Sequence, residues 1–118
     1  MKKIDLHIHT IPTINESEFT FSLKKLQEYI ENAKLDAIAI TNHDLFDIKQ
    51  FETIKDNIKI KTFPGIEINL ESGHLLLISD DDLIEFSTKC GEIAKKNKKT
   101  GDYISVDDLN KIFGYEVV

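Results

Sequence analysis

Residues 36–41 constrain the fold of this chain more than any other segment. They read Asp-Ala-Ile-Ala-Ile-Thr, which is a short and nearly continuous apolar run. A strand with one face in water alternates apolar and polar residues, whereas a continuous apolar run is typical of a strand buried on both faces. Such strands occur in parallel sheets, where helices connect one strand to the next. The sequence therefore predicts an α/β fold.

Amphipathic patterns on both sides of this run support that fold. Apolar residues recur at helical spacing just before it and again just after it. The expected strands are 4–8, 36–41, 58–63, 66–70 and 75–78, and the expected helices are 22–33, 46–55, 83–96 and about 105–114. We expect Pro64-Gly65 to close the third strand. Connections of this length predict right-handed crossovers and a parallel sheet.

Composition limits the classes of function. The chain has 118 residues, of which 41% are hydrophobic, so it can form a single domain with a core. Its formal net charge is −6 and it contains no arginine, which disfavours a nucleic-acid-binding surface. Without a guanidinium group, phosphate chemistry would need another source of positive charge, for which metal ions are the obvious candidate.

Cysteine content and hydropathy bear on the compartment. The single cysteine, Cys90, excludes an internal disulfide framework. The N-terminus has no apolar core of a signal peptide, and no apolar stretch approaches the ~20 residues that span a bilayer. We therefore expect a cytoplasmic protein without a membrane partner.

All four histidines lie at the ends of predicted strands. His7 and His9 close the first strand and point to the same face, because side chains alternate along a strand. His43 follows the second strand, Glu67 follows the third, and His74 begins the last one. Each residue alone has an ordinary explanation as a cap or a solvated side chain. Their placement at one edge of one sheet favours a metal site, since imidazoles and carboxylates are common ligands.

Four short motifs resemble the PHP (polymerase and histidinol phosphatase) family. They are Asp5-Leu6-His7-Ile8-His9-Thr10, Ile40-Thr41-Asn42-His43-Asp44, Pro64-Gly65-Ile66-Glu67-Ile68 and Gly73-His74-Leu75-Leu76-Leu77. The resemblance implies a distorted (β/α)7 barrel, which is a TIM-like architecture. Residues 1–118 would form the N-terminal portion of this single domain. The implied activity is hydrolysis of a phosphate ester by metal-activated water.

The resemblance also implies the site residues. His7, His9 and Glu67 would be catalytic, with Glu67 bridging two metal ions. The implied metal ligands are His7, His9, Glu16, His43, Glu67 and His74. Glu16 represents a residue of the loop after His9, with Asn15 as the alternative, and Asp5 would orient an imidazole. The ions would be Zn²⁺, Mn²⁺ or Fe²⁺, two or three in a complete domain, and the substrate a phosphorylated small molecule or a nucleotide.

The chain departs from the family pattern in two places. Asn42 stands where the family commonly has aspartate, and no histidine follows His74, although the family has later histidine and Asp-x-His ligands. Each metal site would then be at least one ligand short, so we expect weak or partial metal binding. The alternative is a non-catalytic structural or interaction module, with further domains covalently attached.

A half barrel would also leave its last parallel strand unpaired. We therefore expect either self-association through that strand or C-terminal helices folded over it.

Overall fold

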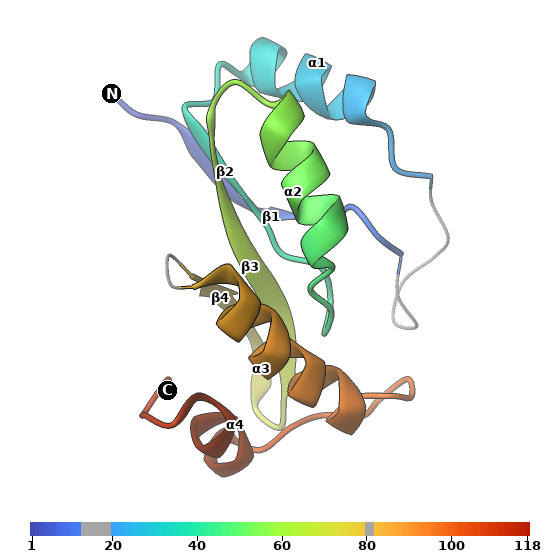
Figure 1. Ribbon diagram of the computed structural model, residues 1–118, viewed down its shortest axis with the longest axis vertical. Coiled ribbons are helices and arrows are strands. Elements are labelled where there is room, and N and C mark those ends of the chain that lie inside the picture. Colours follow the sequence, from blue (N-terminus) through green and yellow to red (C-terminus); the bar gives the residue numbers. More distant parts are fainter. Residues whose placement is uncertain (13–19, 80–81) are drawn as a thin grey trace.

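The computed structural model describes residues 1–12, 20–79 and 82–118 (Figure 1). The elements are β1 (Ile4–Ile8), α1 (Leu23–Ala33), β2 (Ala37–Ile40), α2 (Ile48–Asn57), β3 (Lys61–Leu70), β4 (Gly73–Ile78), α3 (Leu83–Lys96) and α4 (Val106–Phe113). This is a mixed α/β fold. The expected helices and the first two strands are confirmed to within two residues at each end.

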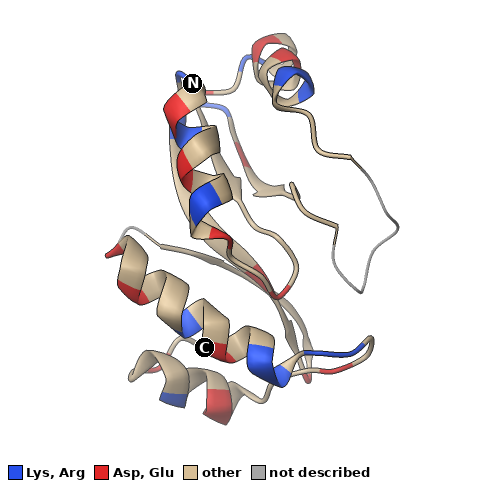
Figure 2. Ribbon diagram, turned by 45° about the vertical axis from the view of Figure 1, so that its right-hand side comes forward, with Lys and Arg blue, Asp and Glu red and all other residues tan. Residues whose placement is uncertain are grey.

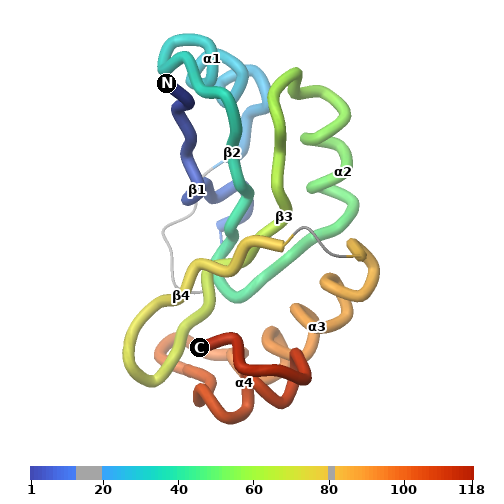
Figure 3. The backbone as a smooth tube through the Cα atoms, turned by 90° about the vertical axis from the view of Figure 1, so that its left-hand side faces the viewer, coloured from blue at the N-terminus to red at the C-terminus, as the bar shows by residue number. Residues whose placement is uncertain are grey.

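The sheet has the strand order β1-β2-β3-β4. β1 pairs with β2 and β2 with β3 in parallel, as predicted, but β4 pairs antiparallel with β3. The expectation that the last parallel strand is unpaired is therefore wrong. A tight turn at Glu71-Ser72 joins β3 to β4, and so short a connection permits only antiparallel pairing. The sheet curls into a half barrel in which β1 and β4 contact each other (Figure 3).

β3 is one strand, not two, so the predicted break at Pro64-Gly65 is wrong. Its first residues pair with β2 up to Pro64, and Gly65 begins the pairing with β4. Proline lacks only the N–H, and its carbonyl oxygen accepts a hydrogen bond from the Ser79 N–H at 2.9 Å. Gly65 lets the strand pass close to its neighbours, since a Cβ atom there would lie 2.8 Å from Cγ2 of Thr41. The two residues mark a change of partner strand.

A single hydrophobic core lies between the sheet and the helices. Ile66 and Ile68 of β3 are fully buried in it, together with residues of all four helices. Phe46, before α2, packs on Phe86 of α3 with ring centroids 5.0 Å apart. Because alternate residues of a strand face opposite sides, Glu67 lies on the other face of the sheet from this core.

Capping side chains and charges agree with the predicted helix ends. Asp82 caps α3 and Ser105 caps α4, each accepting a hydrogen bond from a backbone N–H three residues later. Lys95 and Lys96 lie in the last turn of α3 (Figure 2), where they complement the helix dipole. In the described part of the chain, no helix combines the length and the apolar character needed to cross a membrane.

Candidate metal centre

An irregularity in β1 sets the direction of the first candidate ligand. Asp5 pairs with Ile38 and Ile8 with Ile40, so β1 has one residue more than β2 in this stretch. Such a bulge reverses the alternation of side chains and re-aims the residues beyond it. Asp5 therefore lies toward α1, where it accepts a hydrogen bond from Tyr29, whereas His7 lies toward Glu67.

Asp5 does not orient an imidazole, contrary to expectation. Its Oδ1 accepts a hydrogen bond from the backbone N–H of His7 at 3.0 Å, and its Oδ2 accepts one from the Tyr29 hydroxyl at 2.6 Å. This hydrogen bond raises the pKa of Tyr29. Asp5 thus holds the backbone of the bulge. The alternation rule could not predict this role, because it assumes a regular strand.

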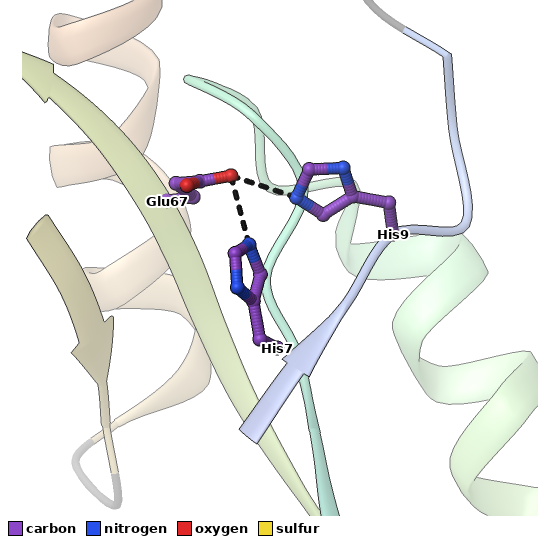
Figure 4. A group of neighbouring side chains, drawn as sticks. All are labelled: His7, His9 and Glu67. Carbon is purple, nitrogen blue, oxygen red and sulfur yellow. Dashed lines mark hydrogen bonds and ion pairs between the residues drawn. The ribbon is translucent and has the colours of Figure 1, made fainter. Parts of the chain in front are cut away.

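Two histidines and one glutamate converge at the end of β1 (Figure 4). His7 Nε2 lies 3.0 Å and His9 Nε2 lies 2.8 Å from the same atom, Oε1 of Glu67. One ligand atom from each of these three residues lies within 4.8 Å of the others. The prediction that the three lie within reach of one ion is confirmed. On the other carboxylate oxygen, Oε2, His74 Nδ1 lies 3.2 Å away.

Glu67 is buried while two of its partners are open to solvent. The side chain of Glu67 is 7% exposed, compared with 50% for His7 and 55% for His74. Burial alone raises the pKa of Glu67, but the hydrogen bonds and charges of His7 and His9 outweigh it and hold the pKa below its ordinary value. The site therefore presents a carboxylate anion beneath a layer of imidazoles.

His43 lies on the same rim but is buried. The backbone around it bridges to β3, because the Glu67 N–H donates to the Asn42 carbonyl and the Asp44 N–H donates to the Glu67 carbonyl. The His43 ring centroid lies 5.1 Å from that of His74 and 6.4 Å from that of His9. All four histidines therefore gather at one edge of the sheet, as predicted. The role of His43 as a ligand stays a prediction.

Asn42 has a structural role that sequence reasoning missed. Its buried Oδ1 accepts hydrogen bonds from the N–H groups of Thr10 and Ile11, and its Nδ2 donates to Oγ1 of Thr10. With both ends of the amide engaged, Asn42 clamps the chain immediately after His9. One sign of this role was present in the sequence, because asparagine stands at position 42 where the family commonly has aspartate. The two candidates for the third metal site, Glu16 and Asn15, lie outside the described residues.

The donor set suits a divalent ion. Two imidazole nitrogens and one carboxylate oxygen fit tetrahedral Zn²⁺ with one open position, and the same donors suit Mn²⁺ and Fe²⁺. Two ligand atoms on one tetrahedral ion with ~2.1 Å bonds lie about 3.4 Å apart. The present nitrogen–oxygen separations of 3.0 and 2.8 Å are close to that value, so small side-chain shifts would admit the ion.

Comparison with known proteins adds no family to this description. No protein-family model and no curated protein matches the sequence. The fold and the site define a mixed α/β domain with a candidate metal centre at one edge of a curled sheet.

Proposed function

We propose that this chain is a PHP-type domain that hydrolyses a phosphate ester with metal-activated water. One observation carries the proposal: ligand atoms of His7, His9 and Glu67 lie within 4.8 Å of one another. The order of the four motifs supports the choice of family. The curl of the sheet and the parallel pairing of β1, β2 and β3 support the finer proposal, an N-terminal part of a distorted (β/α)7 barrel.

The carboxylate of Glu67 is suited to bind two metal ions, one at each of its oxygen atoms. Its Oε1 lies against His7 and His9, and its Oε2 lies against His74. In the proposed centre, His7 and His9 would hold one metal ion beside Oε1 of Glu67, and His74 would hold a second ion beside Oε2. Bound ions would lower the pKa of a shared water and neutralise phosphate oxygens. Because the pKa of Glu67 is held low, its carboxylate is charged at neutral pH without a bound cation.

The substrate class follows from charge and access. The protein is acidic and has no arginine, so metal ions in the site are the best available source of positive charge for a phosphate. His7 and His74 are each about half exposed, which leaves the proposed centre open to a ligand from solvent. We propose a phosphorylated small molecule or a nucleotide as the substrate.

A second candidate is a non-catalytic module that binds one ion. Within the described ranges, only one group of three such ligands meets the geometric requirement. Hydrolysis by two ions about 3.5–4 Å apart requires a second set of ligands. A single ion held by His7, His9 and Glu67 would instead stabilise the edge where β1, β2 and β3 meet.

Metal titration of the chelator-treated protein tests both candidates. Calorimetry with Zn²⁺ and with Mn²⁺ should show binding that Glu67→Gln and His9→Ala each weaken by more than about tenfold. Glu71→Gln is the matched control, because Glu71 is exposed and follows the same strand. Binding together with hydrolysis of p-nitrophenyl phosphate or its diester supports the enzyme. Binding without hydrolysis supports the module, and absence of binding contradicts both.

A further inference from the structure

The carboxylate of Asp44 is buried and lies next to the imidazole of His43. Asp44 has a left-handed backbone with φ of 55°, and two bonds hold it to β3. Its N–H donates to the Glu67 carbonyl oxygen at 2.7 Å, and its Oδ1 accepts a hydrogen bond from the N–H of Asn69 at 2.9 Å. The position of this carboxylate is therefore set by the strand that carries Glu67.

Asn97, at the C-terminal end of α3, supplies a second donor to the same oxygen. Its Nδ2 lies 3.0 Å from Oδ1 of Asp44 and 3.2 Å from the carbonyl oxygen of Asn69. Both contacts require the amide nitrogen, so the orientation of the Asn97 amide is determined. His43, Asp44 and Asn97 are 7%, 6% and 5% exposed. The three side chains thus form a buried connection from α3 to the candidate metal centre.

The two donors on Oδ1 leave the other oxygen of Asp44 facing His43. Asp44 Oδ2 lies 3.8 Å from His43 Nε2, and neither atom has a hydrogen-bond partner among the described residues. A carboxylate oxygen in this position favours the imidazole form with its proton on Nε2. That form leaves a free lone pair on Nδ1. At 3.8 Å the contact is too long for a hydrogen bond, but contacts in functional sites are often long in a ligand-free protein and shorten to hydrogen bonds when the site is filled.

We propose that Asp44 and Asn97 are positioning residues of the metal centre. Asn97 holds Asp44, and Asp44 holds His43 with its proton on Nε2, so that Nδ1 is available to an ion. A carboxylate that fixes the tautomer of a ligating histidine is a common arrangement. The role of Nδ1 rests on the proposed function, but the tautomer of His43 does not. α3, which follows the last of the four motifs, is then part of the support of the site.

Imidazole ¹⁵N spectra of the metal-free protein test the tautomer. We expect wild-type His43 to carry its proton on Nε2. Asp44→Asn should move the proton to Nδ1, because Oδ1 must still face its two donors and the new amide nitrogen then donates to Nε2. Asn97→Ala should give a mixture of the two forms. Asn57→Ala is the control, since Asn57 is an exposed residue at the end of α2 whose amide donates to Thr53. A wild-type proton on Nδ1, or no change in Asp44→Asn, would overturn the proposal.

Co²⁺ and Zn²⁺ titrations of the same variants test the link to the ion. Asn97→Ala and Asp44→Asn should each weaken binding by about 10–100-fold, as loss of an outer partner of a ligand does, and Asn57→Ala should not. Equal binding by wild type and both variants would overturn the inference. A wild type that binds neither ion would overturn the proposed function, while the ¹⁵N result stands on its own. If Asn97→Ala fails to fold, Asp44→Asn alone tests the inference, because an asparagine at position 44 keeps the two hydrogen bonds that Oδ1 accepts.

Discussion

His9 Nε2 lies 2.8 Å from Oε1 of Glu67, although 58 residues separate them in the chain. Their strands are not neighbours, because β2 lies between β1 and β3. Glu67 lies level with His43, which follows the end of β2, and an isolated parallel bridge joins the two residues. The curl of the sheet, which also brings β1 into contact with β4, lets the residues at the end of β1 reach Glu67 past the end of β2.

The charge of Glu67 makes the stability of the metal-free protein depend on pH. Its pKa is lowered on folding, so its contribution is present above the unfolded-state pKa and is lost as the pH falls through the folded-state pKa. We expect the difference in unfolding free energy between wild type and Glu67→Gln to narrow from neutral pH to about pH 3. Urea unfolding with chelator present measures it. Glu71→Gln should show no such trend, and a gap that widens in acid would contradict the prediction.

Asn42 should not tolerate the aspartate that the family commonly has. The Thr10 hydroxyl donates its one proton to Gln50 Oε1, so Thr10 Oγ1 can only accept a hydrogen bond from residue 42. A carboxylate cannot donate. Asn42→Asp should therefore lower the unfolding free energy by about 1–3 kcal/mol, measured by urea unfolding at neutral pH. Asn57→Asp on the surface serves as the control, and equal stability of Asn42→Asp and wild type would refute the prediction.

Gly65 should be intolerant of even one added carbon. A Cβ atom would lie 2.8 Å from Thr41 Cγ2 and 2.9 Å from the backbone oxygen of Leu77, which cannot move without disturbing β4. Gly65→Ala should cost about 1–3 kcal/mol in thermal or urea unfolding. Gly91→Ala in α3 is the opposite case, because in the described part of the chain no atom beyond its chain neighbours and the adjacent backbone of its own helix lies within 4 Å of the added Cβ. It should stabilise the helix by about 0.5–1 kcal/mol, and a similar effect at both glycines would contradict the steric argument.

Cys90 should be chemically silent in the folded protein. Burial raises the pKa of its thiol to about 12, so almost no thiolate exists at neutral pH. We expect a thiol reagent such as DTNB to label Cys90 only at the rate of unfolding, and Cys90→Ala to leave the affinity for Zn²⁺ unchanged. Rapid labelling under native conditions would show that the core around α3 opens more often than this burial implies.

Local patterns in the sequence predicted most of the elements and part of the site. Helical periodicity located α1 and α2, because burying one face of a helix requires apolar residues every third or fourth position. The short apolar run located β2 for the corresponding reason. The charges at the two ends of α3 and the capping residues of α4 located those helices. The positions of His7, His9 and Glu67 just beyond the expected ends of parallel strands predicted that they meet, since parallel strands end at a common edge. They do meet, although Glu67 lies within β3, three residues past its pairing with β2.

The remaining features depend on contacts between distant residues, which no local pattern encodes. Pro64 and Gly65 look like a strand end, but their neighbours Ser79 and Thr41 make them part of a continuous strand. The bulge in β1 turns Asp5 away from the site, and only the pairing with β2 reveals it. Asn97 reaches Asp44 across 53 residues because α3 packs on the sheet. The sequence by itself determined which segments are helices and strands and where most of the candidate ligands lie. The tertiary structure decided which side chains support those ligands, because burial and hydrogen bonding are properties of the assembled core.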